Sequence, residues 1–200
     1  MKSKRIVVAI TGASGVIYGV RLIKALSAAG IHLMVVLSDA GQDVLAHEMG
    51  YMKTKGFDEF LSACGLDFSD DAVLDVFFQN EISSAPASGS FIHNGMVVAP
   101  CSMKTLACIA SGISDNLINR SADVCLKEKR PLILVPRETP YNLIHLENMM
   151  RVSRAGGVIM APNPSFYTFP ETIHHLVDTV VARILDQLKI DHTLLKRWGS

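Results

Sequence analysis

The chain opens with a short apolar segment, which is followed by a turn of small residues and then by a helical segment. Residues 6–10 are all apolar, so a buried strand is predicted over residues 5–10. Residues 15–29 have the spacing of an amphipathic helix that Gly30 ends. Between them lies a turn containing Thr11, Gly12 and Ser14, whose glycine lets another group approach the backbone closely. This order favours a fold in which strands and helices alternate.

The same alternation continues along the rest of the chain. Further strands are predicted at residues 31–37, 73–77, 95–99, 131–135 and 157–161. Further helices are predicted at residues 39–49, 58–63, 103–111, 115–128, 142–155 and 173–188, with loops at 79–94 and 162–170. We therefore expect an α/β fold, a single Rossmann-like, doubly wound parallel sheet with helices on both faces, forming one domain over residues 1–200.

Polar residues follow most of the predicted strands. These polar positions are residues 11–15, 38, 102–105, 137–138 and 163–167. Because ligands of such sheets bind at the carboxyl ends of the strands, we expect these residues to share one site.

The turn at residues 11–15 also suits a phosphate group. A helix N-terminus presents free backbone N–H groups, and Thr11 and Ser14 add hydroxyl donors. The turn lacks the GxGxxG pattern of dinucleotide sites, so a mononucleotide such as FMN is favoured over NAD. A plain strand-to-helix turn without a ligand is the alternative.

Composition narrows the class of protein and of partner. The 19 basic and 19 acidic residues balance, which gives no support for a nucleic-acid or membrane-surface partner. No apolar run approaches the about 18 residues of a membrane span, and no signal peptide is evident, so a cytoplasmic protein is expected. Charged residues make up only 19%, against roughly 25% in ordinary domains, which predicts that part of the surface is covered in a homo-oligomer.

The cysteines, histidines and acidic residues do not show the spacing of a metal site. Four cysteines without CxxC spacing are expected to be reduced thiols. The acidic cluster Asp70, Asp71 and Asp75 resembles a Mg²⁺ site of diphosphate-using prenyl enzymes, but it is short and single, so a solvated turn is preferred. His174 and His175 are expected to be a helix start, and no metal is predicted.

Two short motifs could carry chemistry. Ser102 begins a second strand–turn–helix, where it either caps the helix or donates to a flavin. Arg137 and Glu138 lie in a turn with prolines on both sides. The arginine offers a forked donor set for phosphate, and a glutamate beside bound phosphate suits an acid/base role, with a surface ion pair as the alternative.

Other charged residues give weaker signals. Arg120 and Lys127 lie seven residues apart on one predicted helix face, which is usually a solvated stripe, and Arg183 lies beside the apolar stripe of the last helix. Glu48 stands near the C-terminus of its predicted helix, where a carboxylate is unfavourable, and this placement favours a functional role.

Taken in order, the motifs resemble those of the UbiX-type flavin prenyltransferases, within the superfamily of flavin-containing Cys decarboxylases. The resemblance covers nearly the whole chain. Its motifs are Thr11-Gly-Ala-Ser-Gly15 with Tyr18-Gly19 and Arg21, Pro86-Ala-Ser-Gly-Ser90, Pro100-Cys-Ser102 with Lys104-Thr105, Ala122-Asp-Val124 with Leu126-Lys-Glu128, Arg130-Pro131, Pro136-Arg-Glu138 with Pro140, His145-Leu-Glu-Asn-Met149, Phe166-Tyr167 and Arg197-Trp198.

The resemblance implies an enzyme that joins a dimethylallyl group from dimethylallyl monophosphate to N5 and C6 of reduced FMN, with phosphate as leaving group. It implies that no metal is needed, that the prenylated FMN serves UbiD-type decarboxylases, for example in ubiquinone biosynthesis, and that the protein is a homododecamer with sites at subunit interfaces.

The resemblance also implies roles for individual residues. FMN would be held by Gly12, Ala13, Ser14, Ser38, Ser102, Met103, Lys104, Thr105 and Arg137. The prenyl phosphate would be surrounded by Arg120, Lys127, Arg137, Tyr167 and Arg183, with Ser88, Gly89 and Ser90 lining the pocket from a neighbouring subunit. Glu138 is the expected proton-handling residue, Ser14 would lie near flavin N5, and Glu48 would support catalysis.

One departure and two alternatives accompany this interpretation. Ile82 and its neighbours stand where the family often has an aromatic residue, before the 86–90 loop. The main alternative is an FMN-dependent decarboxylase of the peptidyl-cysteine type, which would use a catalytic histidine and a Pro-x-Met-Asn loop. His93 lacks such surroundings and that loop is absent from the sequence. A non-catalytic flavin carrier is the third possibility.

Overall fold

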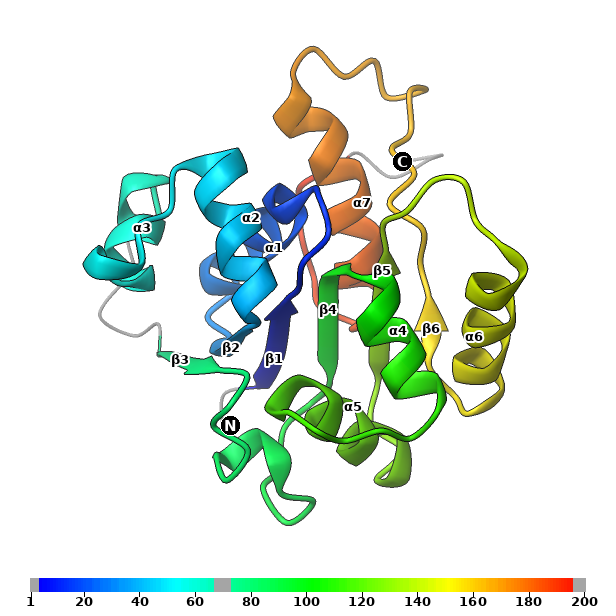
Figure 1. Cartoon of the computed structure of the whole chain (residues 1–200). Helices are drawn as coiled ribbons and strands as arrows, with labels where there is room; N and C mark the ends of the chain where they lie inside the picture. Colours follow the sequence, from blue (N-terminus) through cyan, green and yellow to red (C-terminus); the bar gives the residue numbers. More distant parts are fainter. Residues whose placement is uncertain (1–3, 67–72, 196–200) are drawn as a thin grey trace.

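The computed structural model describes residues 4–66 and 73–195, and it contains one parallel sheet flanked by helices (Figure 1). The strands are β1 (Arg5–Ile10), β2 (His32–Leu37), β3 (Leu74–Phe78), β4 (Met96–Cys101), β5 (Leu132–Pro136) and β6 (Val158–Ile159). Their order is β3-β2-β1-β4-β5-β6, with all neighbouring pairs parallel. The chain progresses outward in opposite directions from β1 and β4, and ligands of such sheets bind at this switch point.

Helices cover both faces of the sheet. They are α1 (Val16–Ala28), α2 (Asp39–Met49), α3 (Phe57–Ala63), α4 (Met103–Ala110), α5 (Leu117–Lys127), α6 (Leu143–Arg154) and α7 (Ile173–Gln187), with short 3-10 helices η1 (Lys53–Lys55) and η2 (Ala85–Ala87). The helices α1, α2, α3 and α7 contribute to one apolar core, and α4, α5 and α6 contribute to the other.

Side-chain alternation along the strands produces these two cores. In β1, Ile6, Val8 and Ile10 belong to the first core, whereas Val7 and Ala9 belong to the second. All five side chains are essentially excluded from water. A strand buried on both faces explains why its sequence is continuously apolar rather than alternating.

The predicted fold class is confirmed, and several element boundaries are corrected. β1 and α2 have their predicted limits. The predicted end of the 95–99 strand is wrong, because β4 continues to Cys101, which pairs with Pro136 after a register shift. Such an irregularity lets a proline remain in a strand. The predicted loop at 79–94 contains η2, and β6 is shorter than predicted.

Some sequence motifs fall outside the described residues. Asp70 and Asp71 of the acidic cluster and the Arg197-Trp198 motif lie there. Within residues 4–66 and 73–195, none of the helices has both the length and the apolar character needed to cross a membrane.

Candidate active site

The turns after β1 and β4 are joined by Thr11. Its hydroxyl donates to the Pro100 carbonyl oxygen at 2.8 Å and accepts from the Ser102 backbone N–H, also at 2.8 Å. Thr11 is only 1% exposed. The buried hydroxyl therefore fixes the 11–15 turn against the start of α4, at the switch point of the sheet.

The turn at Gly12 packs directly against α2, because glycine has no side chain to keep them apart. A Cβ atom added there would lie 2.5 Å from the Cβ of Ala40 in α2. Ser38 caps α2 by accepting from the Gly41 N–H at 2.9 Å, and Ser102 caps α4 by accepting from the Thr105 N–H at 3.3 Å. Both capping serines thus begin helices that border the turn.

Arg137 and Glu138 complete this end of the sheet. They directly follow β5, and the Arg137 Nε donates to the Ser14 carbonyl oxygen at 3.0 Å. A cavity of about 210 Å³ is lined by Gly12, Ala13, Ser14, Ser102, Met103, Arg137 and Glu138. The structure therefore brings together seven of the residues that the sequence assigned to the site.

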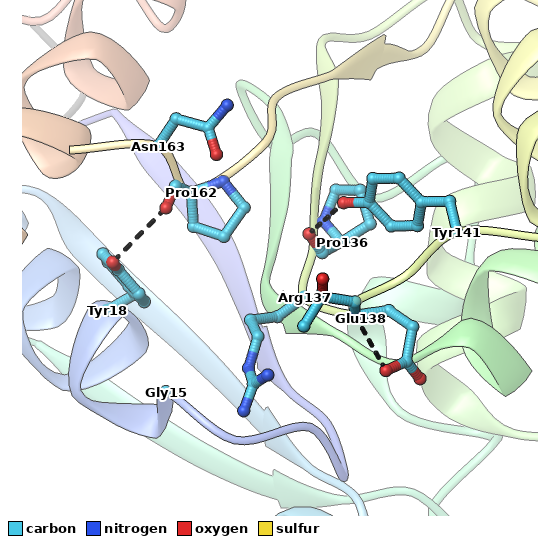
Figure 2. Close-up of a pocket in the computed structure, with 9 residues that line it drawn as sticks. Gly15, Tyr18, Pro136, Arg137, Glu138, Tyr141, Pro162 and Asn163 are labelled. Carbon is cyan, nitrogen blue, oxygen red and sulfur yellow. Dashed lines mark hydrogen bonds between the residues drawn. The ribbon is translucent and has the colours of Figure 1, made fainter.

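A second cavity of about 240 Å³ shares Arg137 and Glu138 with the first. Its lining also includes Gly15, Tyr18, Pro136, Thr139, Tyr141, Pro162 and Asn163 (Figure 2). Burial raises the pKa of Tyr18, with nearby Arg137 opposing the shift, and its hydroxyl donates to the Pro162 carbonyl oxygen at 3.5 Å. In Figure 2 the Arg137 guanidinium extends toward the turn at Gly15. The two cavities form a polar hollow at the carboxyl end of β1, β4 and β5.

Glu48 belongs to the last turn of α2, and its side chain reaches the N-terminus of α1. Its carboxylate accepts from the Gly15 N–H at 2.9 and 3.1 Å and from the Val16 N–H at 3.1 Å. The expectation of free N–H groups is therefore wrong for these two donors. The negative charge of Glu48 is unfavourable at the C-terminus of α2, but the positive end of the α1 dipole stabilises it.

The remaining residues expected at FMN lie on the same border. Thr105 accepts a hydrogen bond from the Ser102 hydroxyl at 3.1 Å. Lys104 is exposed on the first turn of α4, beside Met103. Hydroxyls, backbone donors and a guanidinium around a hollow fit a ligand with a phosphate and a polar ring edge.

A second cluster joins η2, the loop after it and α5. We call Ser88, Gly89, Ser90, Arg120 and Lys127 the cationic cluster. The Arg120 Nε donates to the Ala87 carbonyl oxygen at 3.2 Å, and a Cβ added at Gly89 would lie 2.6 Å from the Lys127 Nζ. Arg120 is paired with Asp123 at 2.7 Å, and Lys127 is paired with Glu128.

Lys127 and the 88–91 loop, which belong to or adjoin the cationic cluster, lie at the opposite end of β5 from Arg137. Arg130, which comes just before β5, donates to the Gly89 and Phe91 carbonyl oxygens at 2.6 and 2.8 Å. Arg137 comes just after β5. Five residues of strand span about 16 Å, so one chain does not bring Lys127 and the 88–90 loop to the Arg137 side.

Tyr167 and Arg183 also stand apart from the hollow. Tyr167 is 60% exposed in the segment between β6 and α7. Arg183 lies in the second half of α7 and pairs with Asp186 at 2.7 Å. Ile82 is exposed before η2. Within the part of the chain that the structure describes, no group of three metal-ligating side chains is found.

Several residues of the hollow were not among those predicted. Tyr141 comes after β5, which is the signal that could have identified it, whereas Asn163 belongs to the 163–167 segment that was expected to share the site. Tyr18 lies in the first turn of α1, and this helix places it at the hollow. Pro162 contributes its carbonyl oxygen, which no sequence pattern marks.

The fold and the hollow define a flavoprotein of the Rossmann-like α/β class. The sequence matches the Flavoprotein family over residues 1–185. More specifically, the chain belongs to the family of UbiX flavin prenyltransferases. It is 46% identical to the flavin prenyltransferase UbiX of Pseudomonas aeruginosa, over 98% of this chain and 95% of the relative.

Solved structures agree with this assignment. AnUbiX (PadA1), crystallised in complex with FMN and dimethylallyl pyrophosphate, is 41% identical and superposes with a TM-score of 0.89 over 100% of this chain and 99% of its own. A dodecameric FMN-dependent UbiX-like decarboxylase from Escherichia coli O157:H7 is 39% identical, with a TM-score of 0.86 over 98% of this chain and 100% of its own.

Proposed function

We propose that this chain is a flavin prenyltransferase that joins a dimethylallyl group from dimethylallyl monophosphate to N5 and C6 of reduced FMN. One observation carries the proposal, namely the polar hollow in which Arg137 and Glu138 meet the Ser14 turn at the switch point of the sheet. Relatives that share this fold are flavin prenyltransferases by name, and one was crystallised with FMN and dimethylallyl pyrophosphate.

Different residues of the hollow would bind FMN and transfer the proton. Gly12, Ala13, Ser38 and the start of α4 would hold FMN, while Ser14 would lie close to flavin N5. When bound, reduced FMN supplies the nucleophilic atoms of the reaction. Glu138 would handle the proton, because it lines both cavities and directly follows Arg137. Glu48 would keep the Gly15 turn in place by capping α1.

The cationic cluster would stabilise the leaving phosphate. A monophosphate is a poor leaving group, so fixed cationic donors must stabilise the charge that develops as its C–O bond breaks. Arg120 and Lys127 carry such charges, with Arg183 and Tyr167 as further candidates. Since Lys127 and the 88–90 loop lie at the opposite end of β5 from the hollow, we infer that a complete site takes the hollow from one copy and the cationic cluster from another.

Exposed apolar side chains support this assembly. Leu143 and Ile144, at the start of α6 beside the hollow, are 69% and 66% exposed, and Ile92, close to the cationic cluster, is 74% exposed. Burial of such surface against another copy would stabilise an oligomer. We propose a homododecamer, the assembly named for the Escherichia coli structure.

The wider setting is proposed on the same basis. One FMN-binding domain would span residues 1–200, act in the cytoplasm without a metal, and pass prenylated FMN to a UbiD-type decarboxylase. The four cysteines, all free in the described residues, fit a reducing compartment. Activity that survives EDTA would support metal independence, and rescue of a treated enzyme by Mg²⁺ would oppose it.

The decarboxylase alternative finds less support in the site. His93 is 3% exposed and bonds to the Gly95 carbonyl oxygen at 3.1 Å, ahead of β4 and so at the other end of that strand from Ser102. A simple flavin carrier would need neither the cationic cluster nor Glu138.

Mass spectrometry of the flavin tests the proposed function. The purified protein is incubated anaerobically with reduced FMN and dimethylallyl monophosphate, and the flavin is then extracted. A mass gain of one prenyl unit is expected, with the diphosphate ester tested in parallel. Unmodified flavin with both esters, while FMN remains bound, would favour the decarboxylase or the carrier.

A further inference from the structure

The buried face of α7 carries two polar residues in an otherwise apolar stripe. Asp178 and Thr179 are 8% and 3% exposed, between Val177 and Val180, which belong to the apolar core. Polar groups at such positions are unfavourable unless they are hydrogen-bonded, and apolar residues of similar volume are often tolerated there. Their partners therefore indicate why they are present.

Asp178 joins α7 to the wall of the hollow that α1 provides. Its carboxylate accepts from the Arg21 Nε at 2.9 Å and from the same guanidinium's Nη2. Arg21 lies three residues after Tyr18 and so on the same side of α1. This forked ion pair fixes the turn of α7 that carries Thr179 relative to Tyr18.

Thr179 joins the same turn of α7 to the neighbouring 162–165 segment, which forms another part of the wall. Its hydroxyl donates to the Leu176 carbonyl oxygen at 2.7 Å and accepts from the Ser165 N–H at 3.0 Å. Ser165 lies between Asn163, which lines the hollow, and Tyr167. Tyr18 and Asn163 both line the hollow, and in Figure 2 Pro162 and Asn163 lie beside Tyr18, across from Tyr141.

We propose that Thr179 is a positioning residue for the prenyl-phosphate side of the site. Its hydroxyl holds the 163–167 segment, and with it Asn163 and Tyr167, at a fixed distance from Tyr18. The direct contact between these two parts of the wall, from the Tyr18 hydroxyl to Pro162, is long at 3.5 Å and supplies little of this restraint. The proposal rests on the proposed function only for its kinetic consequence.

The test compares Thr179→Val with Thr179→Ser. Valine keeps the volume and the branched shape but removes the hydrogen bonds, whereas serine keeps the hydroxyl. We expect Thr179→Val to raise the KM for dimethylallyl monophosphate about 5-fold, the loss typical of one hydrogen bond, and to change the Kd for FMN less than about 2-fold. Thr179→Ser should stay within about 2-fold of the wild type in both.

Hydrogen exchange measured by mass spectrometry gives a readout that needs no activity. Thr179→Val should accelerate amide exchange across residues 162–168, with no change across the 11–15 turn, and Thr179→Ser should not. Unchanged exchange in Thr179→Val would overturn the proposal even if the enzyme is active. So would equal losses of FMN and prenyl-phosphate affinity, or a serine variant as impaired as valine. If the wild type makes no prenylated flavin, the exchange result decides the positioning role alone.

Discussion

Gly12→Ala tests whether close packing between the 11–15 turn and α2 shapes the flavin site. The added Cβ would lie 2.5 Å from the Ala40 Cβ, whereas carbon atoms in contact are about 3.5–4.0 Å apart. The turn and α2 must therefore separate by about 1 Å, and overpacking of this kind costs about 1–3 kcal/mol. For a chain of this length, each kcal/mol lowers the Tm by about 2–4 °C. We expect a lower Tm of the FMN-free protein, measured by circular dichroism, and weaker FMN binding.

Ala40→Gly supplies the matched control for this prediction. In the double variant, Gly12→Ala with Ala40→Gly, the clashing Cβ of residue 40 is gone. The nearest remaining atom of residue 40, its carbonyl carbon, then lies 3.4 Å from the new Cβ at residue 12, which is an ordinary contact. Glycine in a helix costs about 1 kcal/mol by itself. The double variant should therefore be more stable than the sum of the two single changes predicts, by about 0.5–3 kcal/mol. Strictly additive losses would refute the steric explanation.

Three further predictions concern the chemistry and the pH dependence. Glu138→Gln should bind FMN normally but lose about 10²–10⁴-fold in turnover, as general acid/base residues do, and near-normal turnover would remove it from the mechanism. Lys127→Ala should raise the KM for dimethylallyl monophosphate about 10–100-fold and leave FMN affinity unchanged, with Lys55→Ala as the control; equal loss of both ligands would refute its placement. Burial lowers the pKa of His93. Its unfolded form takes up a proton below about pH 6.5 while the folded form does not, so stability should fall as the pH drops below 6.5, and His93→Gln should flatten this slope in pH-dependent unfolding.

Most of the fold and one half of the site follow from local sequence patterns. Continuous apolar runs such as residues 6–10 are strands buried on both faces, and the polar residues after them meet at one end of a parallel sheet. That rule predicted one site for Ser14, Ser102, Arg137 and Glu138, and these residues line one hollow in the structure. The limits of β4 were missed because Pro100 reads as a turn, although a register shift accommodates it in the strand.

The rest depends on contacts between residues far apart in the chain. Glu48 reads as an unfavourable charge on α2, because its partners Gly15 and Val16 lie more than 30 residues earlier. The position of the 88–90 loop beside Lys127 depends on how the loop after η2 packs on Arg130. Neither relation leaves a periodic signal in the sequence.

The central claim is that the prenyl-transfer site is shared between two copies of the chain, and mixed oligomers test it most directly. Glu138→Gln, which disables the hollow, is co-expressed with Arg120→Ala/Lys127→Ala, which disables the cationic cluster, and oligomers containing both are purified through two different tags. Formation of prenylated FMN is then measured against each variant alone. Random mixing of equal amounts pairs an intact hollow with an intact cluster in about one quarter of the sites, so about one quarter of the wild-type rate is expected. A rate no higher than the mean of the two separate variants would place the whole site within one chain and contradict the account.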